Sequence, residues 1–285
     1  MSDVVVISSA PPSAWTYANP VCAWRFLWRQ RNLILQLTRM DLAQRYRGSF
    51  LGAAWTVLTP LLVLTIYTFV FNVILKARWG VNPNEGRLEF ALALFCGLLI
   101  YGVFSECAVV APTVVVNNRN YVKKTVFPLE ALLAVNLGSA LARAGVGLVI
   151  LSIGTVIVTG RVEWTLVFLP AVLVPLALLT LGVSWFLAAL GVFVRDIAQT
   201  VSLVVQLAFF LAPIVYPMSS VPAFVRPFIY ANPFTHMINA ARGAAMWGQV
   251  PQLFSVVFAT LFAVVVFQAG FMFFMKSRRA FADVL

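Results

Sequence analysis

Six long apolar stretches constrain this chain more than any other feature of its sequence. They run over residues 50–75, 90–116, 132–158, 164–194, 197–216 and 252–275. A helix of about 20 mainly apolar residues crosses the hydrocarbon core of a bilayer, which is roughly 30 Å thick. The runs lack the alternation of barrel strands, so helices are expected. The sequence therefore predicts an all-α integral membrane protein with six transmembrane helices.

The composition excludes a soluble domain of this length. Of the 285 residues, 62% are hydrophobic and only 10% are charged, and the mean hydropathy is +0.94. The net charge of +11 is spread over loops that flank the apolar runs, so we expect no nucleic-acid partner, which would need one basic stripe. The three cysteines lack paired metal-ligand spacing, and neither a metal site nor a disulfide framework is expected.

The positive charges indicate the orientation in the membrane. Thirteen of the 20 Lys and Arg lie on the N-terminal side of the predicted spans, six, including Arg242, lie on the opposite side, and Arg143 lies within a span. The positive-inside rule therefore predicts that both termini are cytoplasmic. The first 20 residues contain no Lys or Arg, so the basic start of a secretory signal is missing.

Three parts are expected along the chain. Residues 1–31 form a predicted cytoplasmic tail, residues 32–48 a predicted amphipathic interface helix, and residues 49–285 one six-helix transmembrane domain. The interface helix has two nearly opposite apolar stripes, which consist of Leu33, Leu37 and Met40 and of Leu35, Leu42 and Tyr46. A simple anchor has one broad apolar face. The doubled stripe favours a helix held between the membrane domain and a second protein, while an anchor without a partner stays open.

Residues 217–250 are semi-apolar but interrupted by Pro222, Pro227 and Pro233. Such a segment is too broken to span a bilayer and too apolar for a free loop, so we predict short re-entrant or interfacial helices before the last span. The single histidine, His236, lies here without a neighbouring carboxylate in the sequence. It is interpreted as a polar interface residue and not as a catalytic base.

Two ionisable residues fall inside the predicted spans. Glu106 and Arg143 lie at similar distances from the cytoplasmic ends of the second and third spans, at a depth of roughly 15 to 18 Å if each residue rises 1.5 Å. We expect an intramembrane ion pair that locks the two helices together, because an unpaired charge in lipid is costly. The alternative is a polar lining of a transport path.

Four segments, in order, give the chain a family resemblance. They are DLAQRYRGSFLGAAW from Asp41, RDIAQTV from Arg195, LAPIVYP from Leu211 and ANPFTHMINAARG from Ala231. Together they resemble the membrane subunits of polysaccharide-exporting ABC transporters, the O-antigen and teichoic-acid exporters. The resemblance covers nearly the whole chain.

The resemblance implies a partner arrangement and a substrate. Two copies of the chain would form a channel in the bacterial inner membrane, two copies of a separate cytoplasmic ATPase would drive it, and a lipid-linked polysaccharide would cross it. This chain would bind no cofactor, and ATP would be used by the partner. The sequence agrees, because none of its four lysines follows a glycine as a P-loop requires.

The same resemblance assigns the contacts with the ATPase to the interface helix and to residues 117–130, a short loop that would act as a coupling helix. Aromatic residues of that loop would fill a groove while basic residues steer the approach. A plain positive-inside loop remains the alternative. The predicted coupling residues are Arg39, Asp41, Arg45, Arg47, Arg119, Tyr121, Lys123, Lys124 and Phe127.

Aromatic residues at helical spacing are candidates for the channel lining, because a sugar ring presents an apolar face to an aromatic ring. Tyr67 and Phe71 are four residues apart in the first span, and Phe209, Pro213 and Tyr216 would share one face of the fifth. Aromatic residues also pack against neighbouring helices or lie at membrane interfaces, so a purely structural role stays open for them.

Other functions fit the sequence less well. An intramembrane enzyme needs clustered acids or metal ligands, whereas the nine acidic residues here are scattered. A secondary transporter typically has inverted repeats and charged relays. An ABC exporter subunit for a drug or a small lipid has the same fold and is the main alternative.

Overall fold

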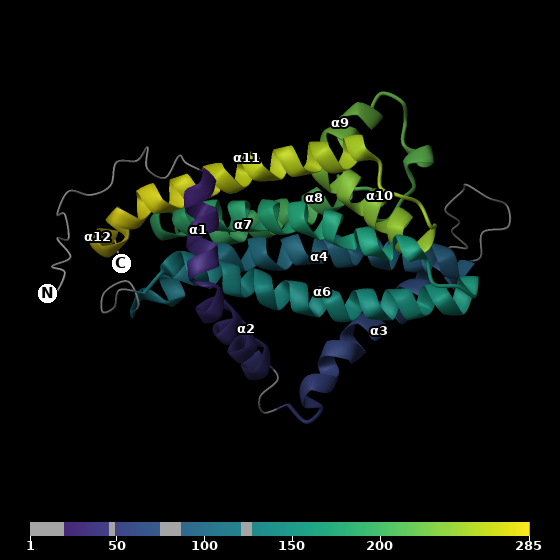
Figure 1. The fold of residues 1–285 in the computed structure, drawn as a ribbon, viewed down its shortest axis with the longest axis horizontal. Helices are drawn as coiled ribbons and strands as arrows, with labels where there is room; N and C mark the ends of the chain where they lie inside the picture. The colour runs from purple at the N-terminus through teal and green to yellow at the C-terminus, as the bar shows by residue number, and fades with distance from the viewer. Residues whose placement is uncertain (1–19, 46–48, 75–86, 121–126, 285) are drawn as a thin grey trace, which may run out of the picture.

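The computed structural model describes residues 20–45, 49–74, 87–120 and 127–284, and this part of the chain contains helices and turns but no strands. Four long helices lie side by side (Figure 1). They are α4 (Arg87–Asn117), α6 (Leu129–Thr159), α7 (Leu169–Phe193) and α11 (Leu253–Ser277). All four are long and apolar enough to cross a membrane. The prediction of an all-α membrane protein is therefore supported within the described residues.

The predicted first and fifth spans are shorter helices. The first is α3 (Trp55–Thr68), which continues as the π-helix η3 (Phe69–Ile74), and the fifth is α8 (Ile197–Phe210). α8 ends six residues before the predicted end at 216, because Pro213 has no N–H to donate and disfavours helical geometry in the residue before it. The described chain thus has four long apolar helices and two shorter ones, and the six-span count is not established by helix length.

Helix formation begins earlier than predicted. The helix α1 (Pro20–Arg29) lies in the region expected to be a tail, and α2 (Arg31–Arg45) covers most of the predicted interface helix. Proline is well tolerated in the first turn of a helix, which explains how α1 can begin at Pro20. α1 crosses the long helices (Figure 1), and its Phe26 ring lies 6.4 Å from the ring of Phe271 in α11.

Residues 217–250 contain short helices, as the prolines predicted. These are the 3-10 turn η5 (Met218–Ser220), α9 (Arg226–Ala231) and α10 (Pro233–Met246). The Asn232 side chain accepts a hydrogen bond from the Phe234 N–H at 3.0 Å and so caps α10. α10 is buried over most of its length against α4, α7 and α11.

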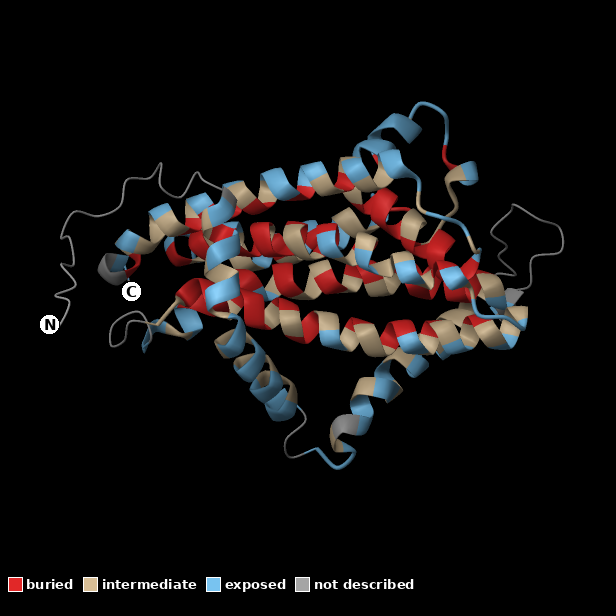
Figure 2. Cartoon of the chain, in the orientation of Figure 1, coloured by how far each residue is buried: buried red, intermediate tan, exposed pale blue. Residues whose placement is uncertain are grey.

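Small residues allow the long helices to approach closely. Gly182 of α7 faces Gly270 of α11, and Gly191 of α7 faces Pro112 of α4, each so near that a Cβ atom would overlap the facing backbone. Such contacts are typical of helix packing in membranes. Trp185 is completely buried nearby, and Figure 2 shows the buried residues concentrated between the long helices.

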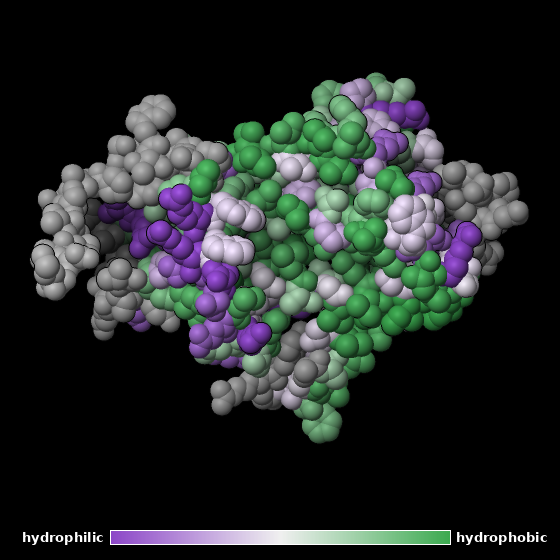
Figure 3. Space-filling view, in the orientation of Figure 1, coloured by the Kyte–Doolittle hydropathy of each residue, from purple (hydrophilic) through white to green (hydrophobic). Residues whose placement is uncertain are grey.

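The two ends of the bundle differ in composition. Arg119, Arg195 and Arg278 follow the ends of α4, α7 and α11 at the same end of the bundle, where α12 (Phe281–Val284) also lies (Figure 1). Hydrophilic side chains gather over α1 and α2 toward this end (Figure 3). The other end carries α10 and the loops around it. The remaining short turns are η2 (Gly52–Ala54), η4 (Trp164–Phe168) and η6 (Arg278–Ala280).

Candidate functional site at the junction of α2, α4 and α6

A carboxylate in α4 binds two arginines from different helices. Glu106 Oε1 accepts a hydrogen bond from Arg143 Nη2 of α6 at 2.5 Å and another from Arg45 Nη1 of α2 at 2.8 Å. The two residues expected to meet inside the membrane therefore do meet. Arg45, which was assigned to ATPase coupling, joins them, and these three residues are called the Glu106 cluster below.

The inward face of α2 explains why Arg45 reaches the bundle. Ile34, Thr38, Asp41 and Arg45 recur at helical spacing and lie on one face. Ile34 packs against the core, and Thr38 lies against Gly138 of α6, where a Cβ atom would come within 2.8 Å of the hydroxyl. α2 therefore docks mainly through a polar stripe.

The predicted apolar stripes of α2 do not form its main contact with the bundle. Leu35 and Met40 are 55% and 48% exposed, and α2 has no fully buried residue. The other stripe residues, Leu33, Leu37 and Leu42, are half-buried, and Tyr46 lies outside the described residues. No other element of the described chain covers the outer surface of α2. That exposure is compatible with the predicted position between the membrane domain and a second protein.

The Glu106 cluster is partly open to its surroundings. Its side chains are 46% exposed at Arg45, 34% at Glu106 and 17% at Arg143. A cavity of about 20 Å³ beside it is also lined by Asp41 and Ser139, a volume that suits a single water molecule. Within the described residues, Arg143 Nη1 and Ser139 Oγ have no hydrogen-bond partner, and both can bond a water there.

The arrangement can transmit movement between α2 and the membrane helices. Because one carboxylate oxygen serves both arginines, a displacement of α2 acts directly on the contact between α4 and α6. Partial exposure lowers the free energy needed to break such a pair. The geometry fits an ion pair that locks helices, and its open side leaves the polar-lining interpretation available.

A second ion pair lies at the C-terminal end of the predicted coupling loop. Glu130, at the start of α6, is buried and accepts two hydrogen bonds from Arg278 Nη1, at 3.1 and 2.9 Å. Arg278 also donates to the Phe127 carbonyl at 3.3 Å, and the Trp185 indole donates to the Glu130 carbonyl at 3.1 Å. Sequence reasoning missed this contact, although Glu130 beside an apolar run was a signal for it.

The remaining predicted coupling residues have different surroundings. Arg39 and Arg119 are exposed and Asp41 is half-buried. Phe127 is half-buried and packs partly against the chain's own core, which leaves less of its ring for a partner. Arg47, Tyr121, Lys123 and Lys124 lie outside the described residues.

The aromatic residues predicted for the channel form two separate groups. Tyr67 and Phe71 stack with their ring centroids 5.9 Å apart, and Phe71 lies 5.5 Å from Phe90 of α4. Phe209 contacts Tyr101 at 5.7 Å in an edge-to-face arrangement. All four predicted residues, including Tyr216, are half-buried, so each has both a packing contact and an exposed part.

The shared helical face predicted for Phe209, Pro213 and Tyr216 does not exist, because α8 ends at Phe210. Tyr216 instead folds back, and its hydroxyl donates to the Phe210 carbonyl at 2.9 Å. A tyrosine phenol is a neutral hydrogen-bond donor at neutral pH. Asn232 donates to the Leu211 carbonyl at 3.1 Å.

Arg242 satisfies the other carbonyls that the end of α8 leaves free. Its guanidinium donates to the carbonyls of Pro213 at 2.7 Å and Ile214 at 2.8 Å, and to Ala93 of α4 at 2.7 Å. The side chain is completely buried, and burial lowers its pKa to about 10. Sequence analysis counted Arg242 as an external loop charge, whereas it joins α10, α8 and α4 from within.

His236 has a structural environment. Its Nε2 lies 2.8 Å from the Tyr230 carbonyl and its Nδ1 lies 3.1 Å from Ser255 Oγ. A neutral ring protonated at Nε2 satisfies both contacts, with Nε2 donating to the carbonyl and Nδ1 accepting from the hydroxyl. This matches the expected polar interface role.

Comparison with known proteins gives consistent family assignments. The sequence profile of the family described as "ABC-2 type transporter" matches residues 32–246. An "O-antigen export system permease protein RfbA" of Myxococcus xanthus is 28% identical over 91% of this chain and 97% of that protein. A Klebsiella pneumoniae protein of the same name is 27% identical over 89% of this chain and 95% of its own length. The "Polysialic acid transport protein KpsM" of Escherichia coli is 22% identical over 85% and 92%.

Proposed function

The chain belongs to the ABC-2 type transporter family, and on this premise we propose that it is the channel-forming subunit of an ATP-driven exporter of a lipid-linked, O-antigen-like polysaccharide. The observation that carries the proposal is similarity to O-antigen export permeases along 91% of the chain. The four apolar helices agree with a multi-pass membrane subunit. The proposed location is the bacterial inner membrane, with both termini in the cytoplasm.

The proposed channel forms between two copies of the chain. α3 has no fully buried residue, and α8 buries only Val201 and Val205. These two helices therefore keep most of their apolar surface for lipid or a second copy. A homodimer with α3 and α8 at its centre would use this surface and leave the close-packed long helices undisturbed.

The energy is proposed to come from two copies of a separate ATPase that contact α2 and the 117–130 loop. The exposed outer face of α2 supplies one surface, and Arg39 and Arg119 supply exposed positive charge. ATP-driven closure of the ATPases would move α2, and the Glu106 cluster would pass that displacement to α4 and α6. The proposed opening then occurs by movement of whole helices.

The test is to co-express the tagged chain with the ATPase encoded beside it and to purify the complex in detergent. Two copies of each subunit, with ATP turnover that rises when lipid-linked glycan is added, is the expected result. Failure to capture an ATPase contradicts the proposal. Stimulation by drugs or simple lipids but not by glycan favours the alternative exporter function.

A charge-reversal series sharpens the test of the ATPase contact. Arg39→Glu and Arg119→Glu are expected to lower recovery of the ATPase, because both side chains are exposed on the proposed docking surfaces. Arg195→Glu is the matched control, since Arg195 is also an exposed arginine at this end of the bundle but is not assigned to the contact. Equal loss in all three variants would indicate a general charge effect.

A further inference from the structure

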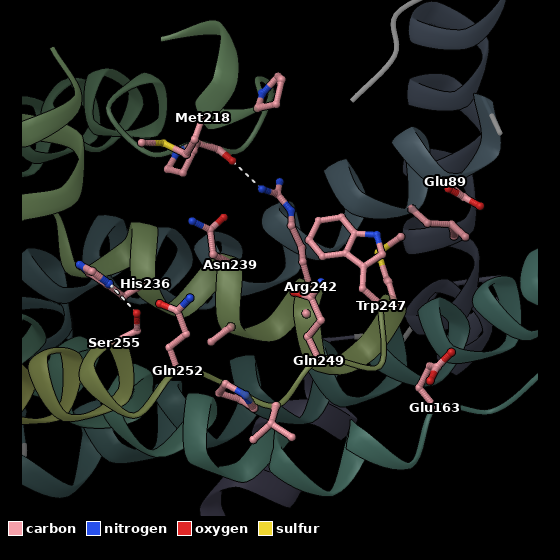
Figure 4. Close-up of a pocket in the computed structure, with 18 of the residues that line it drawn as sticks. Glu89, Glu163, Met218, His236, Asn239, Arg242, Trp247, Gln249, Gln252 and Ser255 are labelled. Atoms are coloured by element: carbon pink, nitrogen blue, oxygen red, sulfur yellow. Dashed lines mark hydrogen bonds between the residues drawn. The ribbon is translucent and has the colours of Figure 1, made fainter. Parts of the chain in front are cut away.

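A cavity of about 820 Å³ lies at the end of the bundle opposite α12, between α10 and the ends of α4 and α6. Its size falls within the range of small-molecule sites. Figure 4 shows Asn239, which projects from α10, and Trp247, which follows α10, both directed toward the segment that carries Met218. This cavity is separate from the Glu106 cluster and is called the outer cavity below.

Three amide side chains of the outer cavity are not used by the fold. Asn239, Gln249 and Gln252 make no side-chain hydrogen bonds within the described residues, and all three line the cavity. Each amide offers two donors and a carbonyl acceptor. This donor and acceptor set matches adjacent hydroxyl groups, which both donate and accept.

An aromatic ring accompanies these amides. Trp247 lines the cavity and is 36% exposed, so part of its indole face is free for contact. The turn that follows is fixed by Gly248, whose φ of 61° favours glycine, and the Glu163 carboxylate lies against that turn. Trp247 and Gln249 are thereby held on either side of a defined backbone turn.

The charged residues that line the outer cavity, two arginines and two glutamates, balance one another. Among its described lining residues, Arg161 is paired with Glu163 at 3.2 Å, and Arg242 donates to three backbone carbonyls. Glu89 and Glu163 add negative charge to the lining. The described lining therefore carries no excess positive charge that would favour a phosphate or a sugar carboxylate over a neutral ligand.

We propose that the outer cavity binds one or two neutral sugar units of the exported glycan, with Trp247 under the apolar face of a ring and Asn239, Gln249 and Gln252 bonding its hydroxyls. The site rests on the proposed export function and adds a substrate class to it. It would hold the chain after it has passed the bundle. Polymers with a charge on each sugar are expected to bind poorly.

Saturation-transfer NMR on the purified complex with its ATPase tests the proposal. The neutral probes are mannotriose, galactotriose and maltotriose, and the anionic probe is a trimer of sialic acid. Transfer to the ring C–H protons of at least one neutral trisaccharide, and not of the sialic acid trimer, is expected. Trp247→Ala should weaken binding about fivefold, as the loss of one aromatic contact implies, and Trp247→Phe should restore part of it.

Trp164→Ala is the matched control, because Trp164 lies at the same end and is 65% exposed but does not line the cavity. Its binding should equal that of the unaltered chain. No transfer to any neutral trisaccharide, equal transfer in Trp247→Ala, or equal binding of the sialic acid trimer overturns the site. If glycan export by the same complex persists in those cases, the site alone is wrong. Absence of glycan export in the unaltered complex counts against the proposed function.

Discussion

Two arginines inside the bundle, Arg143 and Arg242, are held in different ways. Arg143 shares a carboxylate with Arg45, and that carboxylate is 34% exposed. Arg242 is completely buried and donates hydrogen bonds to three backbone carbonyls. The comparison indicates that the shared, partly exposed carboxylate of Glu106 is the more easily broken contact, whereas Arg242 holds the irregular end of α8 in place.

Replacing Arg242 should have the largest effect on stability. A small effect would contradict the structural role that the comparison gives to Arg242. Arg242→Met removes the charged donor of three buried carbonyls. The Ala93 carbonyl keeps its hydrogen bond within α4, whereas the carbonyls of Pro213 and Ile214 are left unsatisfied, at a cost of about 1–3 kcal/mol each. We expect little folded protein by size-exclusion chromatography and a much lower thermal unfolding temperature. Arg226→Met is the control, since exposed Arg226 also donates to backbone carbonyls but should remain folded.

Breaking the Glu106 cluster should have the next largest effect. Glu106→Gln leaves Arg45 and Arg143 without their common carboxylate, whereas Arg143→Gln leaves Glu106 paired with Arg45. Both variants should impair assembly. Glu106→Gln should lower the free energy of unfolding by about 2 kcal/mol more than Arg143→Gln does, a cost below the range measured when one partner of a fully buried pair is removed. Recovery of the assembled complex and its thermal stability are the measurements.

The outcome also decides between the two interpretations of the Glu106 cluster. If both variants assemble normally but stop export, the polar-lining interpretation replaces the ion-pair lock. Arg161→Gln serves as the assembly control, because its ion pair is at the surface, with the arginine 78% exposed. Surface pairs contribute little to stability.

Arg45→Gln should separate coupling from stability. The Arg45 side chain is 46% exposed, so its loss should change stability by less than about 1 kcal/mol. We expect normal assembly with a clear fall in export, since α2 loses its polar link to α4. Export and ATP turnover are measured together, and Arg29→Gln in α1 is the control. A decrease in stability equal to that of Glu106→Gln would contradict the interpretation that the Arg45–Glu106 contact can break while the protein stays folded.

The smallest expected effect comes from the packing of α2 on α6. A Cβ at Gly138 would lie 2.8 Å from Thr38 Oγ1, whereas one at Gly145 would meet no atom within 4 Å. Gly145→Ala should stabilise α6 by about 0.5–1 kcal/mol through helix propensity, and Gly138→Ala should lose that gain by displacing α2. Thermal unfolding of the two variants makes the comparison, and equal stabilisation would show that α2 moves freely.

Parts of the candidate site could be predicted from the sequence. Glu106 and Arg143 were expected to meet because each is costly in lipid and both have similar depth along neighbouring helices. The third member, Arg45, was not predicted, because its position depends on how α2 lies across α6. Arg242 was misassigned for the same kind of reason, since its partners Pro213, Ile214 and Ala93 belong to other elements.

The sequence by itself determined the all-helical membrane class and the family, because long apolar runs and ordered motifs are properties of the chain alone. It predicted a fifth span that continued through Pro213 to residue 216, and that end was wrong. Only the tertiary structure decided that α8 ends at Phe210 and that Arg242 binds the freed carbonyls. It likewise brought Arg45 to Glu106 and formed the outer cavity. These features require helices distant in sequence to pack together, and hydropathy along the chain does not specify that packing.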